Sequence, residues 1–475
     1  MFIFEYTTSG GVTKTTLVSI INASGSVVIP DGVELAAYSL YGLNDITELT
    51  LPGTLKTMPS MLNNMPIGYS GGTVIIPEGV TTISAFVFQY GEFDTIVIPS
   101  TVTSIGSGAF MNSKIKSIVI PSSVEKIDNN AFKGCTSLTS VTFNNGLISI
   151  GDGAFEGCTA LTSVTFPETL TTIGNSAFRS TGLTTLTVPA NVTTIGKFVD
   201  TKMDQWGNVN NNFYNYGYVF ADCKNLTRVT YYPTTINSKH MFDGCTALTS
   251  VSFPGNKLTS IDGWTFYGCS SLGTFPFFNG ITNIGPYAFS GTRLGQVFIP
   301  YTVTRLCDGA FANCTNLQRV TFAENATNPA QLKYIGGETI TSLDTTSNEG
   351  GVFEGCTKLN YVQLPSSLVA INGRTFAGCT ALQSIVLGNK ISFIGADAFE
   401  GWTSSQVVNS TQSEYTITGL WANETSENGY ASFMANTDAQ FVWNYVEQSQ
   451  GGGGGESEGS ESSGGESSGD GEERP

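Results

Sequence analysis

The sequence predicts a β-rich solenoid of about 15 repeats of 22–24 residues with two loop insertions. One observation is literal repetition, because the segment 131–143 returns 23 residues later, at 154–166, with only small changes. A second is that short apolar strand segments and a following phenylalanine both recur at this period. Both intervals lengthen to 42–43 residues at the same two places, which indicates two insertions and no loss of the repeat. A repeat of this size cannot bury a core alone, so stability has to come from stacking on its neighbours.

The first element is an N-terminal cap over residues 1–26, a hairpin that turns at Ser9-Gly10-Gly11 and covers the open end of the solenoid. The adjoining strands have apolar residues at outward positions where later repeats have threonine. A continuous exposed apolar row indicates an interface. The sequence therefore predicts a docking stripe for self-association or for another protein, made of Val28, Ile75, Val97 and Val119.

The solenoid itself is expected over residues 27–400. In Leu138–Phe143 the leucine, valine and phenylalanine alternate with Thr and Ser, the period-two pattern of a half-buried strand. A proline or Asn-Gly turn follows, then a short Ile-Gly segment and an Ala-Phe pair that places a ring in the core.

This repeat resembles the BspA-like, or treponemal-type, leucine-rich-repeat family. The resemblance rests on the pattern A-F-x-G-C-T-x-L-x-S-V-x-F-P-x-x-L-x-x-I-G, nearly complete from Ala154 to Gly174, and covers about residues 25–400. It implies a leucine-rich-repeat-type, right-handed coil and a non-enzymatic surface adhesin or host-interaction protein. Such proteins usually carry an export signal, whereas the apolar start Met1–Tyr6 has no basic region before it and predicts none.

The two insertions are expected at about 196–219 and 326–350, and loops on a rigid scaffold often carry recognition. Aromatic rings among asparagines in the first suggest stacking on sugar faces; packing of the rings onto the coil edge is the alternative, and both remain open. The predicted ligand-binding residues are Trp206, Phe213, Tyr214, Tyr216 and Tyr218. The second insertion is polar and predicts a surface loop.

Residues 401–447 are rich in aromatic side chains and predict a C-terminal cap, and residues 448–475 predict a disordered acidic Gly/Ser tail. The net charge is −17, of which seven acidic groups and one arginine in the last 25 residues supply −6. An acidic surface without a basic stripe argues against nucleic-acid partners. No run of eighteen apolar residues predicts membrane insertion.

The reactive residue types predict no catalytic or metal site. Eight of the nine cysteines occupy one repeat position and no C-x-x-C occurs, so buried thiols are expected and a disulfide ladder is the alternative. His240 is the only histidine and replaces a small residue before a core phenylalanine, which favours a structural role. We expect no cofactor, no metal and no enzyme activity.

Two function classes follow. The first is a non-enzymatic binding scaffold, an adhesin or receptor-binding protein that recognises glycan or protein at a cell or virion surface. The alternative is a structural virion component (an appendage, fibre or decoration protein) docked through its N-terminal coils. The expected partners are a protein or glycan on a cell surface, other virion proteins, or further copies of the chain. The second class includes a cytoplasmic stage before assembly or release.

Overall fold

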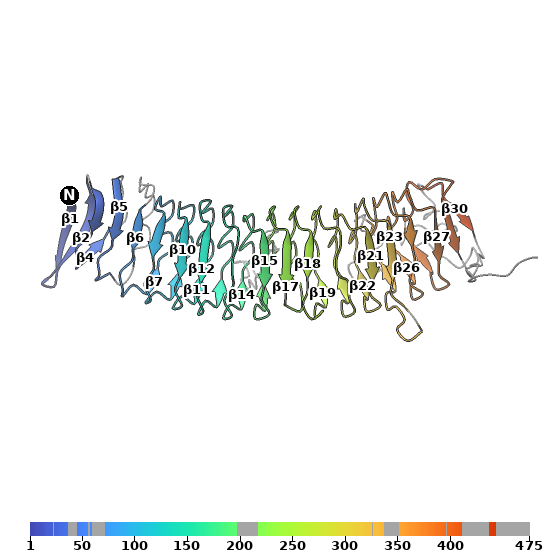
Figure 1. Cartoon of the computed structure of the whole chain (residues 1–475), viewed down its shortest axis with the longest axis horizontal. Coiled ribbons are helices and arrows are strands. Elements are labelled where there is room, and N and C mark those ends of the chain that lie inside the picture. Colours follow the sequence, from blue (N-terminus) through green and yellow to red (C-terminus); the bar gives the residue numbers. More distant parts are fainter. Residues whose placement is uncertain are drawn as a thin grey trace, which may run out of the picture.

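The protein is a long rod whose strands lie across the long axis and follow one another in sequence order along it (Figure 1). The computed structural model describes residues 1–21, 23–36, 45–55, 58, 72–196, 217–324, 326–336, 351–395, 397–410 and 437–442. These residues form a parallel β-solenoid of about 14 turns, which confirms the predicted fold class. Within these ranges no helix is long and apolar enough to cross a membrane.

An antiparallel hairpin stands at the N-terminal end. Strand β1 (Phe2–Ser9) pairs with β2 (Val12–Ile20), and Gly10 and Gly11 between them have φ of 60° and 81°. Strand β2 in turn pairs in parallel with β4 (Val33–Leu35), so the hairpin continues into the first coil.

Most coils contribute one strand to a first ladder, in which residues alternate between core and solvent; the coils at 161–166 and 272–277 form no strand there. In β10 and β12, Ile118 pairs with Val141 and both are buried, whereas Val119 pairs with Thr142 and both are exposed. The first ladder consists of β3 (Ser24–Val28), β5 (Asp45–Thr50), β6 (Thr73–Ile75), β8 (Thr95–Val97), β10 (Ser117–Ile120), β12 (Ser140–Phe143), β15 (Thr185–Val188), β17 (Arg228–Tyr231), β18 (Ser250–Ser252), β21 (Gln296–Ile299), β23 (Arg319–Phe322), β25 (Tyr361–Val362), β27 (Ser384–Leu387), β29 (Val407–Ser410) and β30 (Gln440–Val442).

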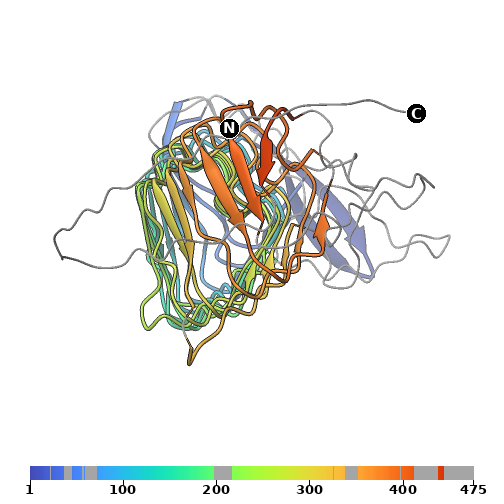
Figure 2. The same cartoon turned by 90° about the vertical axis from the view of Figure 1, so that its right-hand side faces the viewer.

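A second ladder of short strands closes another side of the coil, seen end-on in Figure 2. Its typical strand is Thr-Ile with the isoleucine buried, as in β14, and it runs in two stretches, β7 to β16 and β19 to β28. Its members are β7 (Thr82–Ile83), β9 (Ser104–Ile105), β11 (Lys126–Ile127), β13 (Ser149–Ile150), β14 (Thr172–Ile173), β16 (Thr194–Ile195), β19 (Ser260–Ile261), β20 (Asn283–Ile284), β22 (Arg305–Leu306), β24 (Tyr334–Ile335), β26 (Ala370–Ile371) and β28 (Phe393–Ile394).

The third side of each coil is the turn around a phenylalanine, and these phenylalanines form a column in the core. From Phe88 to Phe399 each ring is buried and stacks on the next, with centroids 4.9–5.9 Å apart. The residues two before and two after the phenylalanine have positive φ in almost every described turn, as Asn130 and Gly134 do around Phe132. Two left-handed residues therefore bend the chain tightly around each ring.

Regular solenoid turns lie on both sides of each expected insertion. The chain is described up to Gly196 and again from Gly217, and the residues between lie outside the described ranges. In the second case β24 lies inside the range 326–350 and pairs with both β22 and β26, so residues 334–335 belong to the second ladder. Near the C-terminus β29 and β30 extend the first ladder through the range expected to form the cap.

Candidate interaction surface

The outward row of the first ladder is the most regular surface of the rod. It is formed by the third residue of each strand segment, and in the middle coils this residue is mostly threonine, as at Thr142, Thr187 and Thr230. Hydroxyl-bearing β-branched residues suit a solvated strand face. Departures from threonine therefore show where the row has a different surface chemistry.

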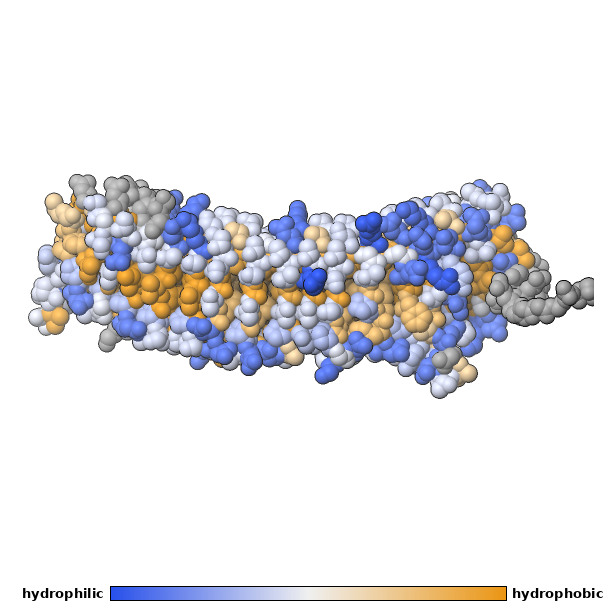
Figure 3. Space-filling view, viewed as in Figure 1, coloured by the Kyte–Doolittle hydropathy of each residue, from blue (hydrophilic) through white to orange (hydrophobic). Residues whose placement is uncertain are grey.

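The predicted docking stripe lies at the N-terminal end of this row. Val28, Val97 and Val119 are 60%, 50% and 56% exposed, and Ile75 is half-buried. Thr50 stands in register between Val28 and Ile75 and interrupts the apolar residues. The hydrophobic band on the face shown in Figure 3 is widest over these N-terminal coils. The four residues are thus in line on one face, and their docking role stays a prediction.

A second departure lies farther along the same face, and we call it the aromatic patch: Phe298, Arg319 and Tyr361. Phe298 is 53% exposed and Tyr361 is 40% exposed. Arg319 and Tyr361 are register partners on β23 and β25, and the guanidinium carbon lies 3.8 Å from the centroid of the tyrosine ring. Arg319 forms no ion pair with a carboxylate of the described residues. The patch therefore combines exposed rings with a cation that is not neutralised.

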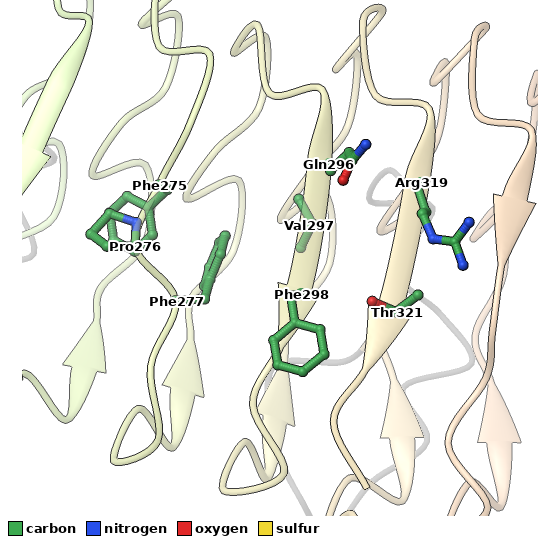
Figure 4. A pocket seen from close by; sticks show the side chains of 8 residues that line it. All are labelled: Phe275, Pro276, Phe277, Gln296, Val297, Phe298, Arg319 and Thr321. Carbon is green, nitrogen blue, oxygen red and sulfur yellow. The ribbon is translucent and has the colours of Figure 1, made fainter.

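A depression of about 290 Å³ adjoins the aromatic patch, and Figure 4 shows the side chains around it. Its origin is Pro276, which occupies the outward strand position and has no N–H to donate, so no strand forms between β18 and β21. The lining residues are Phe275, Pro276, Phe277, Gln296, Val297, Phe298, Arg319 and Thr321. The break thus leaves the half-buried Phe277 and the exposed Phe298 beside outward polar side chains.

Most of the predicted ligand-binding loop lies outside the described residues. This applies to Trp206, Phe213, Tyr214 and Tyr216. Tyr218 is described, and its half-buried ring stacks on His240 at 4.3 Å while the guanidinium of Arg179 lies 5.1 Å from its centroid. The ring of Tyr218 therefore contacts two residues of neighbouring turns, His240 and Arg179.

His240 is held in a stack and does not face an open cleft. Its Nδ1 lies 2.8 Å from Asp243 Oδ2, its side chain is 16% exposed, and its ring stacks between Tyr218 and Trp264 at 4.3 and 5.1 Å. Trp264 continues the stack to Tyr287 at 5.5 Å. Within the described ranges no group of three or more His, Cys, Asp or Glu side chains could hold a metal ion.

All nine cysteines are buried free thiols. Eight of them form the predicted column, and each donates its S–H to the carbonyl of a phenylalanine in the preceding turn, as Cys245 Sγ does to Phe220 O at 3.2 Å. Burial raises the pKa of Cys379 to about 12 and that of Cys158 well above its ordinary value, so these two thiols stay protonated at neutral pH.

Sequence reasoning overlooked the aromatic patch although its signal is present. Phe298 breaks the threonine row just as the N-terminal valines do, but it is a single residue, with Pro276 and Thr321 as its neighbours in the row. The sequence does not reveal that Arg319 pairs with Tyr361, because the second long repeat separates the two residues by 42 positions.

Comparisons with known proteins agree with this architecture. A family model described as BspA type leucine rich repeat region matches six times, over residues 22–139, 81–200, 126–246, 208–318, 234–348 and 339–426. A leucine-rich repeat protein from Bacteroides ovatus is similar in structure, with a TM-score of 0.51 and 21% identity over 82% of this chain and 94% of that one.

Two further solved structures share lower similarity. A leucine rich cell surface protein from Faecalibacterium prausnitzii has a TM-score of 0.39 and 21% identity over 90% of this chain and 97% of that one. The pneumococcal vaccine antigen PcpA has a TM-score of 0.47 and 15% identity over 94% and 97%. No curated protein matches the sequence.

Proposed function

The chain belongs to the BspA-type leucine-rich-repeat family, and from this premise we propose that it is a non-enzymatic scaffold that binds a protein partner at a cell surface. The aromatic patch is the single observation that carries the proposal. Aromatic and arginine side chains are enriched in the energetically dominant centres of protein interfaces. Here Phe298, Arg319 and Tyr361 are presented beside a depression on an otherwise hydroxylated strand face.

The strands hold the aromatic patch in place before any partner arrives. Each residue lies on a strand of a sheet whose core side chains are close to fully buried, such as Val320 beneath Arg319. Such a rigid presentation lowers the entropy that binding must overcome. A partner that offers a carboxylate to Arg319 and an apolar side chain to the depression would match this surface.

The test compares two threonine substitutions at the same strand position. Phe298→Thr restores the common residue of the row within the patch, and Val386→Thr does so on β27, outside it. We expect Phe298→Thr to reduce retention of cell-surface proteins on the immobilised chain about tenfold or more, because a central aromatic residue contributes about 1.4 kcal/mol or more. Val386→Thr should retain them, and both variants should keep the parental melting temperature. Equal retention by the two variants would refute the proposal.

The docking stripe favours a second candidate, a structural role within a larger assembly. Three valines that are half or more exposed on one row suit a contact between copies or with another structural protein. In this case Val97→Thr combined with Val119→Thr should convert an oligomer into a monomer in light scattering. A parent chain that is monomeric at high concentration would remove self-association from consideration.

A further inference from the structure

The second ladder has a gap between the coil that ends in β16 and the next coil, which contains Ile236. In neighbouring coils the residue after the buried isoleucine donates its N–H to the preceding isoleucine: Gly196 to Ile173 at 2.8 Å, and Asp262 to Ile236 at 3.0 Å. The corresponding bond from Asn237 to Ile195 is not formed. The ladder is continuous on either side, from β7 to β16 and from β19 to β28.

The cause is a turn that is too short. Tyr231 to Ile236 spans five positions, where the equivalent Phe166 to Ile173 spans seven. The first ladder is nevertheless closed at the same place, because β15 and β17 pair over four residues. The two coils therefore touch along the first ladder and separate along the second, and Tyr231 fills the core behind with its hydroxyl donating to Thr235 O at 2.9 Å.

The separation produces a cavity of about 310 Å³, which we call the notch. This volume is larger than the gaps of a well-packed core and is of a size to take a short piece of peptide. The polar lining residues are Thr193, Tyr232, Thr234, Thr235, Asn237 and Lys257.

The backbone groups on the two walls of the notch are complementary. One wall presents the carbonyls of Thr193 and Ile195, and the other presents the N–H groups of Thr234 and Asn237. None of these four groups has a hydrogen-bond partner among the described residues. Elsewhere in the ladder such groups bond directly, as Thr259 N does to Thr234 O at 2.8 Å. An extended peptide inserted between the walls would donate to the first and accept from the second.

The rim of the notch adds a charge. Lys257 has an exposed side chain and forms no ion pair with the described carboxylates, in a chain whose net charge is −17. A carboxylate on the inserted peptide would find an ammonium group there. We propose that the notch binds a short, extended, acidic peptide segment by main-chain hydrogen bonds to both walls, with its carboxylate at Lys257. The notch lies on the second ladder and uses no residue of the aromatic patch.

The test uses three synthetic peptides and the full chain at low salt. The probe is acetyl-Gly-Thr-Asp-Thr-Gly-amide, with one counterpart carrying Asn for Asp and one N-methylated at the central amides. Calorimetry should give the aspartate peptide about threefold tighter binding than the asparagine peptide, the size expected of one exposed ion pair. The N-methylated peptide should not bind, because it cannot donate to the first wall.

Two lysine variants separate the charge effect from general electrostatics. Lys257→Gln should abolish the preference for aspartate. Lys390→Gln, at the equivalent turn position after Gly388-Asn389, should keep it. Hydrogen–deuterium exchange should slow at Thr234 and Asn237 when the aspartate peptide is bound. Absence of saturable binding, binding of the N-methylated peptide, or an unchanged preference in Lys257→Gln would each overturn the proposal.

Discussion

At the residue scale, the third position after each core phenylalanine from Phe110 to Phe399 carries a side chain with a proton to donate, and these side chains form a column. Cysteine fills it in most turns, but Trp402 donates its Nε1–H to Phe376 O at 3.0 Å in the same way as Cys379 Sγ donates to Phe353 O at 3.2 Å. The position is occupied in successive turns by Ser113, Cys135, Cys158, Thr181, Cys223, Cys245, Cys269, Thr292, Cys314, Cys356, Cys379 and Trp402. What the position requires is therefore a side chain that is small or apolar and also has a proton to donate.

Substitutions at Cys245 should separate these two requirements. Cys245→Ala removes the donor and should lower the free energy of unfolding by about 1 kcal/mol, because Phe220 O loses one of its bonds. Cys245→Ser keeps a donor and should cost less, as Ser113 and the threonines of the column suggest. Thermal denaturation followed by circular dichroism measures both. An alanine variant as stable as the parent would show that the hydrogen bond of the thiol adds no stability.

The repeat alone predicted that these cysteines are buried and unpaired, but not that they donate. Spacing identifies a core position, whereas a sulfur bond to a carbonyl in the preceding turn depends on how two turns align. The threonine, serine and tryptophan substitutions carried the missing information. In the sequence they look like random exceptions to the repeat, and their shared position in one column is seen only in the structure.

At the element scale, the turn around each phenylalanine needs two left-handed residues. The second of them is most often glycine, as at Gly134, Gly157 and Gly244, which agrees with the glycine of the repeat. The first is frequently another residue, such as Asn130 or His240, and so its left-handed conformation could not be predicted from the repeat. Side chains forced outward at this first position also explain why Tyr218, His240, Trp264 and Tyr287 stack on one another.

Substitutions at the second left-handed position should change the free energy of unfolding in opposite directions in two different turns. Ser180 has φ of 56° and its hydroxyl forms no hydrogen bond with the described residues, so Ser180→Gly should raise the free energy of unfolding by about 0.5–1 kcal/mol. At Gly157, φ is 74° and an added Cβ would lie 3.7 Å from the nearest atom, so Gly157→Ala should lower it by a similar amount through strain alone. Urea denaturation measures both. Destabilisation by Ser180→Gly would mean that glycine's flexibility in the unfolded chain outweighs the relieved strain.

At the scale of the whole molecule, the predicted continuous solenoid forms because its coils use the same inward residues. Periodicity of strands and phenylalanines was sufficient for the fold class and for one continuous core. The two interruptions that form the depression beside the aromatic patch and the notch were not predicted. Pro276 and the short turn after Tyr231 each alter one coil, and a period averaged over many repeats conceals a single altered member.

Damage to the phenylalanine column should remain local. Phe266→Ala removes a fully buried ring and should cost the coils around it about 3–5 kcal/mol. Because each coil contacts only its neighbours, hydrogen–deuterium exchange should accelerate near β19 and β20 and remain unchanged near β9 and β11. Phe298→Thr, on the surface, serves as the control and should accelerate neither. Uniform acceleration along the rod would show that the solenoid unfolds as one unit.

The direction of the inter-coil hydrogen bonds has a mechanical consequence. They run along the rod, so a pull on its two ends is borne by every joint in series, and the joint with the fewest bonds yields first. At the joint after β16 the second-ladder bonds are missing, while the first ladder, the stacked rings Phe178 and Phe220, and bonds of the phenylalanine turn such as Phe178 N to Val219 O still bridge the two coils. Under stretching, opening at this joint should therefore start on the side of the notch, where no bond between described residues joins the two walls.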